Sequence, residues 1–291
     1  MANDNSNFKF FHYDPSLAAA VIFAILFFAT ASMHAFQLLR RRAWLMIPFF
    51  IGGCFELIGY IARAIACRQT PNWTLGPFIV NTLLVLVAPA LFAASIYMLL
   101  GRIMLLTGGE QYSMIRRRWL TKLFVGGDVL SFLMQSSGGG IMAGKTAKAI
   151  DLGQNIVVGG LVVQILFFGF FLVVAAVFHL RIGRKPTAES RDVPWKRHIN
   201  TLYAASILIL IRSIFRVVEY RQGNDGYLLD HEVFLYIFDA VLMLGVMVLF
   251  NVVHPSEISI LLRRGKVLGQ SSQLNSITNV RENAKGDGGQ V

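Results

Sequence analysis

The chain has 291 residues, of which 55% are hydrophobic and 15% charged, and its mean hydropathy is +0.58. Its apolar residues form long blocks separated by short basic loops, which is typical of an integral membrane protein and excludes an ordinary soluble domain. The net charge of +11 does not indicate nucleic-acid binding, because the basic residues flank apolar blocks rather than alternating with aromatic residues. The two cysteines, Cys54 and Cys67, are too few for a disulfide framework or a cysteine zinc site.

Seven apolar segments follow one another, each long enough to cross a hydrocarbon core as a helix of about 20 residues. They are 16–39, 44–66, 77–105, 120–143, 155–180, 200–219 and 232–254. The runs lack the period-two alternation of barrel strands, and helices satisfy their own backbone hydrogen bonds in lipid. We therefore predict an all-α polytopic membrane protein with seven transmembrane helices.

Basic residues in the loops predict the orientation, since cytoplasmic loops carry the excess of Lys and Arg. The first loop holds Arg40 to Arg42 and the third holds Arg116 to Arg118, whereas the alternate loops are poor in basic residues. We expect the N-terminus outside and the C-terminus in the cytoplasm. The expected parts are an extracellular or lumenal segment 1–15, a transmembrane domain 16–254 and a cytoplasmic tail 255–291.

Two features outside the helices complete this topology. The tail after Lys266 is rich in Ser, Asn, Gln and Gly, and such a segment buries too little apolar surface to fold alone, so the tail is expected to be disordered. Asn72-Trp73-Thr74 is a glycosylation sequon in a predicted outer loop, which makes Asn72 a candidate glycosylation site.

Polar residues inside the apolar segments are the most informative. A charge near the bilayer centre costs about 2.5–3.5 kcal/mol, so such residues normally face the bundle interior. Four segments carry them at helical spacing, which places each set on one helix face. The four stripes are Glu56, Tyr60 and Arg63; Asp128, Ser131 and Gln135; Arg212, Arg216 and Glu219; and Glu232, Tyr236 and Asp239. We predict that they converge on an outward-opening or mid-membrane polar cavity.

Two compatible interpretations of the stripes remain open. In the structural one, ion pairs and hydrogen bonds fix which helices are neighbours. In the functional one, the cavity binds an amphiphile with a polar, cationic head, because the carboxylates outnumber the guanidinium groups. No metal site is expected, because the histidines are scattered and show neither HxxxH nor HExxH spacing.

Several of these residues also carry a family resemblance. In chain order the matching residues are Glu56 to Tyr60 with Arg63, Ala88-Pro89, Asp128, Ser131, Gln135, Gln164, Arg212, Phe215-Arg216, Glu219-Tyr220, His231-Glu232, Tyr236 and Phe238-Asp239. This ordered set resembles the fungal lipid-translocating exporter family, which is associated with resistance to aminocholesterol and to sphingoid long-chain bases. The resemblance covers roughly residues 12–256.

The resemblance implies a fungal protein of the plasma membrane, or alternatively of internal membranes, that exports lipids or moves them across the bilayer and confers resistance to toxic amphiphiles. The alternative is a seven-helix receptor-like sensor of lipids or stress that signals through a cytoplasmic partner. A zinc-dependent membrane hydrolase is disfavoured by the scattered histidines. No enzymatic activity and no cofactor are expected, and no Walker motif is present in the sequence.

A mechanistic hypothesis follows from the carboxylate excess. Glu56, Asp128 and Asp239 are expected to bind the ammonium group of a sphingoid base or similar lipid. Arg63, Arg212 and Arg216 are expected to orient the lipid or to bind a phosphate. The other expected binding residues are Tyr60, Gln135, Gln164, Glu219, Glu232 and Tyr236.

Overall fold

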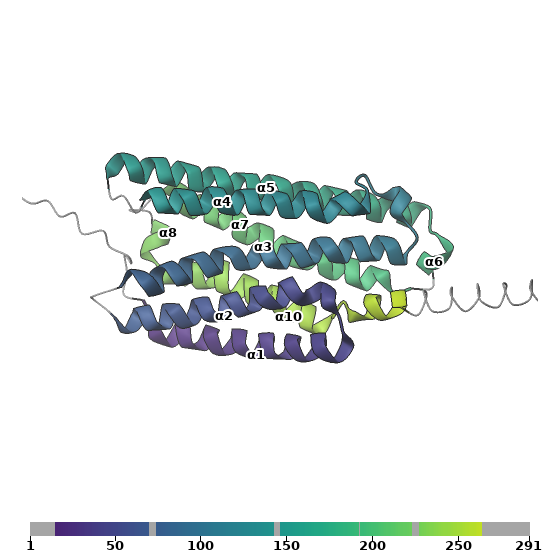
Figure 1. Ribbon diagram of the computed structural model, residues 1–291, viewed down its shortest axis with the longest axis horizontal. Coiled ribbons are helices and arrows are strands. Elements are labelled where there is room, and N and C mark those ends of the chain that lie inside the picture. The colour runs from purple at the N-terminus through teal and green to yellow at the C-terminus, as the bar shows by residue number, and fades with distance from the viewer. Residues whose placement is uncertain (1–14, 70–73, 143–145, 192, 223–226, 264–291) are drawn as a thin grey trace, which may run out of the picture.

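The computed structural model describes residues 15–69, 74–142, 146–191, 193–222 and 227–263 (Figure 1). These residues are helical apart from short connections and include no strand, so the predicted all-α class is confirmed. The helices are α1 (Leu17–Arg41), η1 (Trp44–Met46), α2 (Ile47–Arg68), α3 (Leu75–Leu106), η2 (Glu110–Tyr112), α4 (Arg117–Met142), α5 (Ala147–Arg184), α6 (Ala188–Arg191), α7 (Trp195–Gln222), α8 (Tyr227–Asp230), α9 (Glu232–Leu235), the π-helical turn η3 (Tyr236–Val241) and α10 (Leu242–Val252).

The long helices correspond to the predicted segments. The largest differences are at α5, which begins at Ala147 rather than 155, and at α7, which begins at Trp195 rather than 200. The extra turns carry exposed charged residues, Lys148 and Asp151 in α5 and Lys196 and Arg197 in α7. A helix continues past its apolar stretch where water can solvate the added side chains, and hydropathy alone does not mark that end.

Six helical segments in the described part of the chain are long and apolar enough to cross a membrane. They are Leu17–Arg41, Trp44–Arg68, Gly76–Leu106, Lys148–Arg184, Trp195–Gln222 and Glu232–Arg263. Length and composition therefore support six spans where seven were predicted. The remaining segment, 120–143, forms most of α4, which has 26 residues but is less apolar because of its glycines, serines, Asp128 and Gln135.

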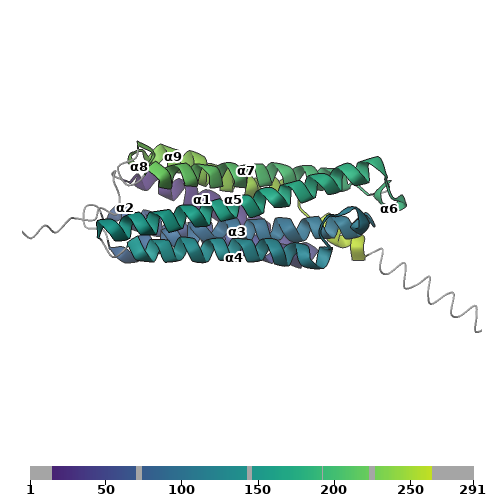
Figure 2. The same cartoon turned by 90° about the horizontal axis from the view of Figure 1, so that it is seen from above.

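The long helices lie side by side along one axis (Figures 1 and 2). In Figure 1, α4 and α5 lie on one side of the bundle and α1 and α2 on the other, with α3 between α4 and α2. The most extensive contacts join α1 to α2, α2 to α3 and α4 to α5. Large apolar side chains such as Ile25, Leu166 and Val173 are more than half exposed on the outer faces. Such faces suit contact with lipid tails.

Small residues let neighbouring helices approach closely. At Gly59 of α2, an added Cβ atom would lie 2.7 Å from Cγ2 of Val85 on α3. At Gly138 of α4, it would lie 2.6 Å from the carbonyl oxygen of Gly153 on α5. These glycines therefore set the spacing of α2 from α3 and of α4 from α5.

The helical part of the chain extends beyond residue 254, the predicted end of the transmembrane domain. Residues 256–263 form a further helix, and the side chains of Ser256 and Ile258 are fully buried. Residues 256–263 of the segment 255–291, which was expected to be a disordered tail, are therefore helical. Ile258 and Leu262, four residues apart and so on one face of this helix, pack on the apolar core of the bundle. Residues 264–291 lie outside the described residues.

Candidate functional site

A first polar contact links α2 to α9 and η3. Arg63 is buried, and its Nη2 atom lies 2.8 Å from Oε1 of Glu232. Its Nε donates a hydrogen bond of 3.1 Å to the hydroxyl of Tyr236. The guanidinium carbon lies 5.3 Å from the centre of the Tyr236 ring, within the range of a cation–π interaction. The second oxygen of Glu232 accepts a hydrogen bond of 2.8 Å from the backbone N–H of Ser16, so this carboxylate also holds the start of α1.

A second group of charges lies between α7 and η3. The carboxylate of Asp239 accepts from Nε of Arg212 through one oxygen and from Nη2 of Arg216, at 2.7 Å, through the other. Arg216 also donates to Glu219 at 2.9 Å. Buried charges are costly unless they are paired and hydrogen-bonded, and both conditions are met here.

The local backbone explains two of these positions. Asp239 lies within the π-helical turn η3, and such turns occur often at functional sites. On α3, Pro89 has no N–H to donate to the carbonyl of Val85, four residues earlier. That carbonyl instead accepts a hydrogen bond of 2.9 Å from Nη2 of Arg212. The proline therefore leaves an acceptor that positions the arginine.

Glu56 is the unusual member of this core. Its side chain is 1% exposed, and neither carboxyl oxygen has a hydrogen-bond partner among the described residues. Asp239, Arg212 and Arg216 lie near enough to interact with it electrostatically. One turn along α2, the hydroxyl of Tyr60 is likewise buried without a hydrogen bond to a described residue. Because nearly all buried polar groups in proteins are hydrogen-bonded, an unpaired carboxyl marks a candidate binding position.

The polar residues of α4 form a separate group with α5. The hydroxyl of Ser131 donates to the carbonyl of Gly160 at 2.7 Å, and Nε2 of Gln135 donates to Ser131 at 2.6 Å and to Oε1 of Gln164 at 3.3 Å. Asp128 is buried without a hydrogen bond to a described residue. Its carboxyl lies beside the hydroxyl of Tyr97 on α3.

The structure therefore brings three of the four predicted stripes together and places the α4 stripe apart. α4 packs on α5 and α3, and α3 separates it from α2 (Figures 1 and 2). The hypothesis that Asp128 shares one site with Glu56 and Asp239 is not supported by this arrangement. Asp239 also differs from expectation, since two guanidinium groups already occupy both of its oxygens. The sequon residue Asn72 lies outside the described residues.

The sequence interpretation missed a polar contact between α1 and α10. Nδ1 of His34 lies 3.1 Å from Oδ1 of Asn251, and Nδ2 of Asn251 donates to the carbonyl of Thr30 at 3.1 Å. Gln37 donates to the carbonyl of Asn251 at 3.0 Å. The available signal was Asn251 itself, the one Asn in the apolar segment 232–254. Within the described residues, no group of three or more His, Cys, Asp or Glu side chains is placed to hold a metal ion.

Comparison with known protein families covers the part of the chain that holds this polar core. The family model described as RTA1 like protein matches residues 49–260. The chain belongs to the RTA1-like family. The matched range includes the polar groups around Arg63 and around Asp239, except Ser16. The family match confirms the resemblance to fungal lipid-translocating proteins.

Relatives of this RTA1-like chain come from fungi. It is 36% identical over 288 residues to protoporphyrin uptake protein 1 of Saccharomyces cerevisiae, covering 87% of this chain and 94% of the relative. It is 31% identical to the probable lipid transporter atnI of Emericella nidulans, covering 84% and 67%. It is 23% identical to the sphingoid long-chain base transporter RSB1 of Saccharomyces cerevisiae, covering 86% and 74%. No solved structure matches the chain significantly.

Proposed function

We propose that this protein exports lipids or toxic amphiphiles such as sphingoid bases, or moves them across the bilayer, and so confers resistance to them. The observation that carries the proposal is the buried, unpaired carboxyl of Glu56 inside a membrane helix bundle. Relatives named as a lipid transporter and as a sphingoid long-chain base transporter support it. Another relative is named as an uptake protein, so the transport assay measures both directions.

The proposed topology has seven spans, with α4 as the fourth. Its 26 residues rise about 1.5 Å each, giving about 39 Å, which exceeds a hydrocarbon core of about 30 Å. Its basic residues Arg117, Arg118 and Lys122 lie within the first two turns, near the connection that holds η2. The basic C-terminal end of α1 lies at the same end of the bundle as η2 and α6 (Figure 1). This supports a cytoplasmic location for that end, since cytoplasmic loops carry the excess of basic residues. The plasma membrane is the proposed location, with internal membranes as the alternative.

In the proposed mechanism, Glu56 binds the ammonium group of the lipid by an ion pair. Arg212 and Arg216 already neutralise Asp239, so Glu56 is the carboxyl of this core that remains for a cation. Because Glu56 is buried, the head group enters only when helices separate. Pro89 in α3 and the π-helical turn η3 interrupt the regular α-helical hydrogen bonding next to this core and are the proposed sites of bending. The activity is transport without catalysis, and no cofactor takes part.

The test is transport of a labelled sphingoid base by purified protein in liposomes. We expect Glu56→Gln to reduce the rate at least about tenfold, since a lost charge-assisted contact is worth about 1.5–3 kcal/mol. Glu110→Gln is the matched control, because Glu110 forms an exposed ion pair with Arg117 at the bundle end. Its transport should equal that of the unmodified protein.

Two outcomes would contradict the proposal. Equal transport by Glu56→Gln and the unmodified protein would remove Glu56 from the mechanism. Transport no faster than in protein-free liposomes, together with loss of cellular resistance on deleting residues 267–291, would favour the receptor-like sensor with a cytoplasmic partner.

A further inference from the structure

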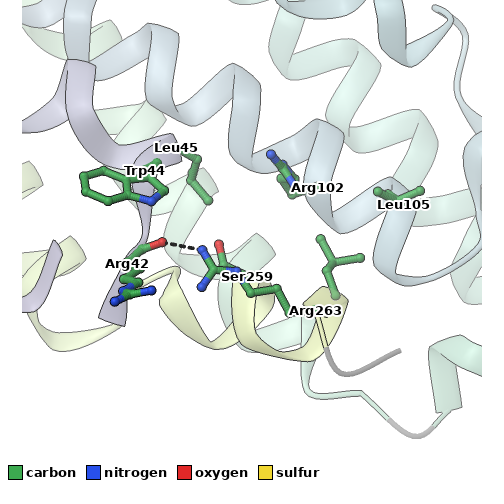
Figure 3. Close-up of a pocket in the computed structure, with 8 residues that line it drawn as sticks. Arg42, Trp44, Leu45, Arg102, Leu105, Ser259 and Arg263 are labelled. Carbon is green, nitrogen blue, oxygen red and sulfur yellow. Dashed lines mark hydrogen bonds between the residues drawn. The ribbon is translucent and has the colours of Figure 1, made fainter. Parts of the chain in front are cut away.

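A further polar feature lies at the basic end of the bundle, away from the buried core. A pocket of about 110 Å³ is formed where the α1–η1 connection, α3 and the helix 256–263 meet (Figure 3). It is lined by Arg42, Trp44, Leu45, Arg102, Leu105, Ser259, Leu262 and Arg263. Three of these eight described lining residues are arginines, and none is acidic.

The backbone at the end of α1 orients one of the arginines. Arg42 has a φ angle of +49°, in the left-handed region that side-chain-bearing residues rarely adopt. Its carbonyl oxygen accepts a hydrogen bond of 2.8 Å from Nη2 of Arg263, as Figure 3 shows. The guanidinium of Arg263 is therefore held at the pocket by the main chain rather than by a carboxylate.

The charge distribution of the pocket selects an anion. Arg42, Arg102 and Arg263 are all exposed, and no ion pair with a described carboxylate neutralises them. Guanidinium groups gathered around one space repel each other, and an anion between them removes that repulsion. The planar guanidinium donates paired hydrogen bonds that match phosphate oxygens, and the hydroxyl of Ser259 is a further donor.

The position of the pocket indicates the source of the anion. Trp44 is 54% exposed at its edge, and tryptophan side chains favour the headgroup level of a bilayer. Basic pockets between membrane helices suit anionic lipid headgroups. We propose that the pocket lined by Arg42, Arg102 and Arg263 binds the phosphate group of an anionic phospholipid from the adjacent leaflet.

Binding of phosphatidic acid to the purified full-length protein in detergent tests this site. Titration with short-chain phosphatidic acid is compared with phosphatidylcholine of the same chains and with inorganic phosphate. We expect phosphatidic acid to bind more tightly than both. Arg102→Gln and Arg263→Gln should each weaken its binding about tenfold, which corresponds to about 1.4 kcal/mol.

Arg118→Gln is the matched control, because Arg118 is exposed in the first turn of α4, is basic, and does not line the pocket. Its affinity for phosphatidic acid should not change. Arg102→Lys keeps the charge but not the paired donors and should bind with intermediate affinity, which separates recognition of phosphate from loss of folding.

Three results would overturn the proposal. Equal binding of phosphatidic acid and phosphatidylcholine would remove the selectivity for an anionic headgroup. An equal loss of affinity for phosphatidic acid in Arg118→Gln would show that binding depends on the overall positive charge at this end of the bundle. Inorganic phosphate binding as tightly as phosphatidic acid, with the same losses in the pocket variants, would assign the site to soluble phosphate instead of lipid. None of these readouts depends on transport, so the outcome is independent of Glu56.

Discussion

At the scale of single residues, the core contains carboxyl groups with ion-pair partners and one carboxyl group without a partner among the described residues. Asp239 accepts from Arg212 and Arg216, and Glu232 pairs with Arg63. Glu56 has neither a hydrogen bond nor an ion pair with any described residue, although it is as buried as Asp239. The paired charges fix the helices, which supports the structural interpretation of the stripes. The unpaired carboxyl of Glu56 is compatible with the functional interpretation, in which the stripes bind an amphiphile.

The role of Asp239 can be tested through stability. Asp239→Leu removes the carboxylate between two arginines and leaves both guanidinium groups without that partner. We expect a loss of about 3–5 kcal/mol in the free energy of unfolding, the usual effect of breaking a buried ion pair. Denaturant unfolding in detergent micelles measures it. For comparison, Glu110→Gln breaks an exposed pair and should cost about 0–1 kcal/mol; similar losses in both variants would mean that the Asp239 cluster does not hold the helices.

At the scale of helices, close packing at glycines and breaks in regular geometry shape the bundle. Gly59 lets α2 approach α3, and Gly138 lets α4 approach α5. The π-helical turn η3 and Pro89 of α3 interrupt the regular hydrogen bonding beside the charged core. The helix pair of α4 and α5 is therefore a closely packed unit, whereas the region around Arg212 contains two irregular segments.

Two adjacent glycines of α4 provide a test of this packing. An added Cβ at Gly138 would lie 2.6 Å from the carbonyl oxygen of Gly153, whereas at Gly139 it would meet nothing within 4 Å. Gly138→Ala should lower the free energy of unfolding by about 1–3 kcal/mol through overpacking. Gly139→Ala should be neutral or raise it by up to about 1 kcal/mol, because Ala favours the helix over Gly. Thermal unfolding of both variants measures the difference, and equal melting temperatures would contradict the close contact of α4 with α5.

At the scale of the whole molecule, α4 is the long helix for which length and hydropathy give different numbers of spans. Length and packing favour a crossing, whereas hydropathy supports only the six other segments of the described chain. Asp128, Ser131 and Gln135 lower the hydropathy of α4 but face its helix neighbours, where they are buried. A helix whose polar face is covered by protein needs lipid-compatible residues only on its outer side.

Labelling of single cysteines decides the number of spans. In a background without Cys54 and Cys67, Ser113→Cys precedes α4 and Thr146→Cys follows it. With seven spans, a membrane-impermeant maleimide added outside should label Thr146→Cys and spare Ser113→Cys until the membrane is permeabilised. Labelling of both positions from the same side would show that α4 does not cross.

The sequence by itself determined that this protein lies in a lipid bilayer and is built from helices. Continuous apolar runs require helices in lipid, and the cost of burying charge requires that Glu56, Arg63 and Arg212 face protein, as all three do. Helical spacing fixes the face of a residue but not its neighbour. Only the tertiary structure therefore decided that Arg212 pairs with Asp239, that Asp128 lies apart behind α3, and that arginines distant in sequence form one pocket.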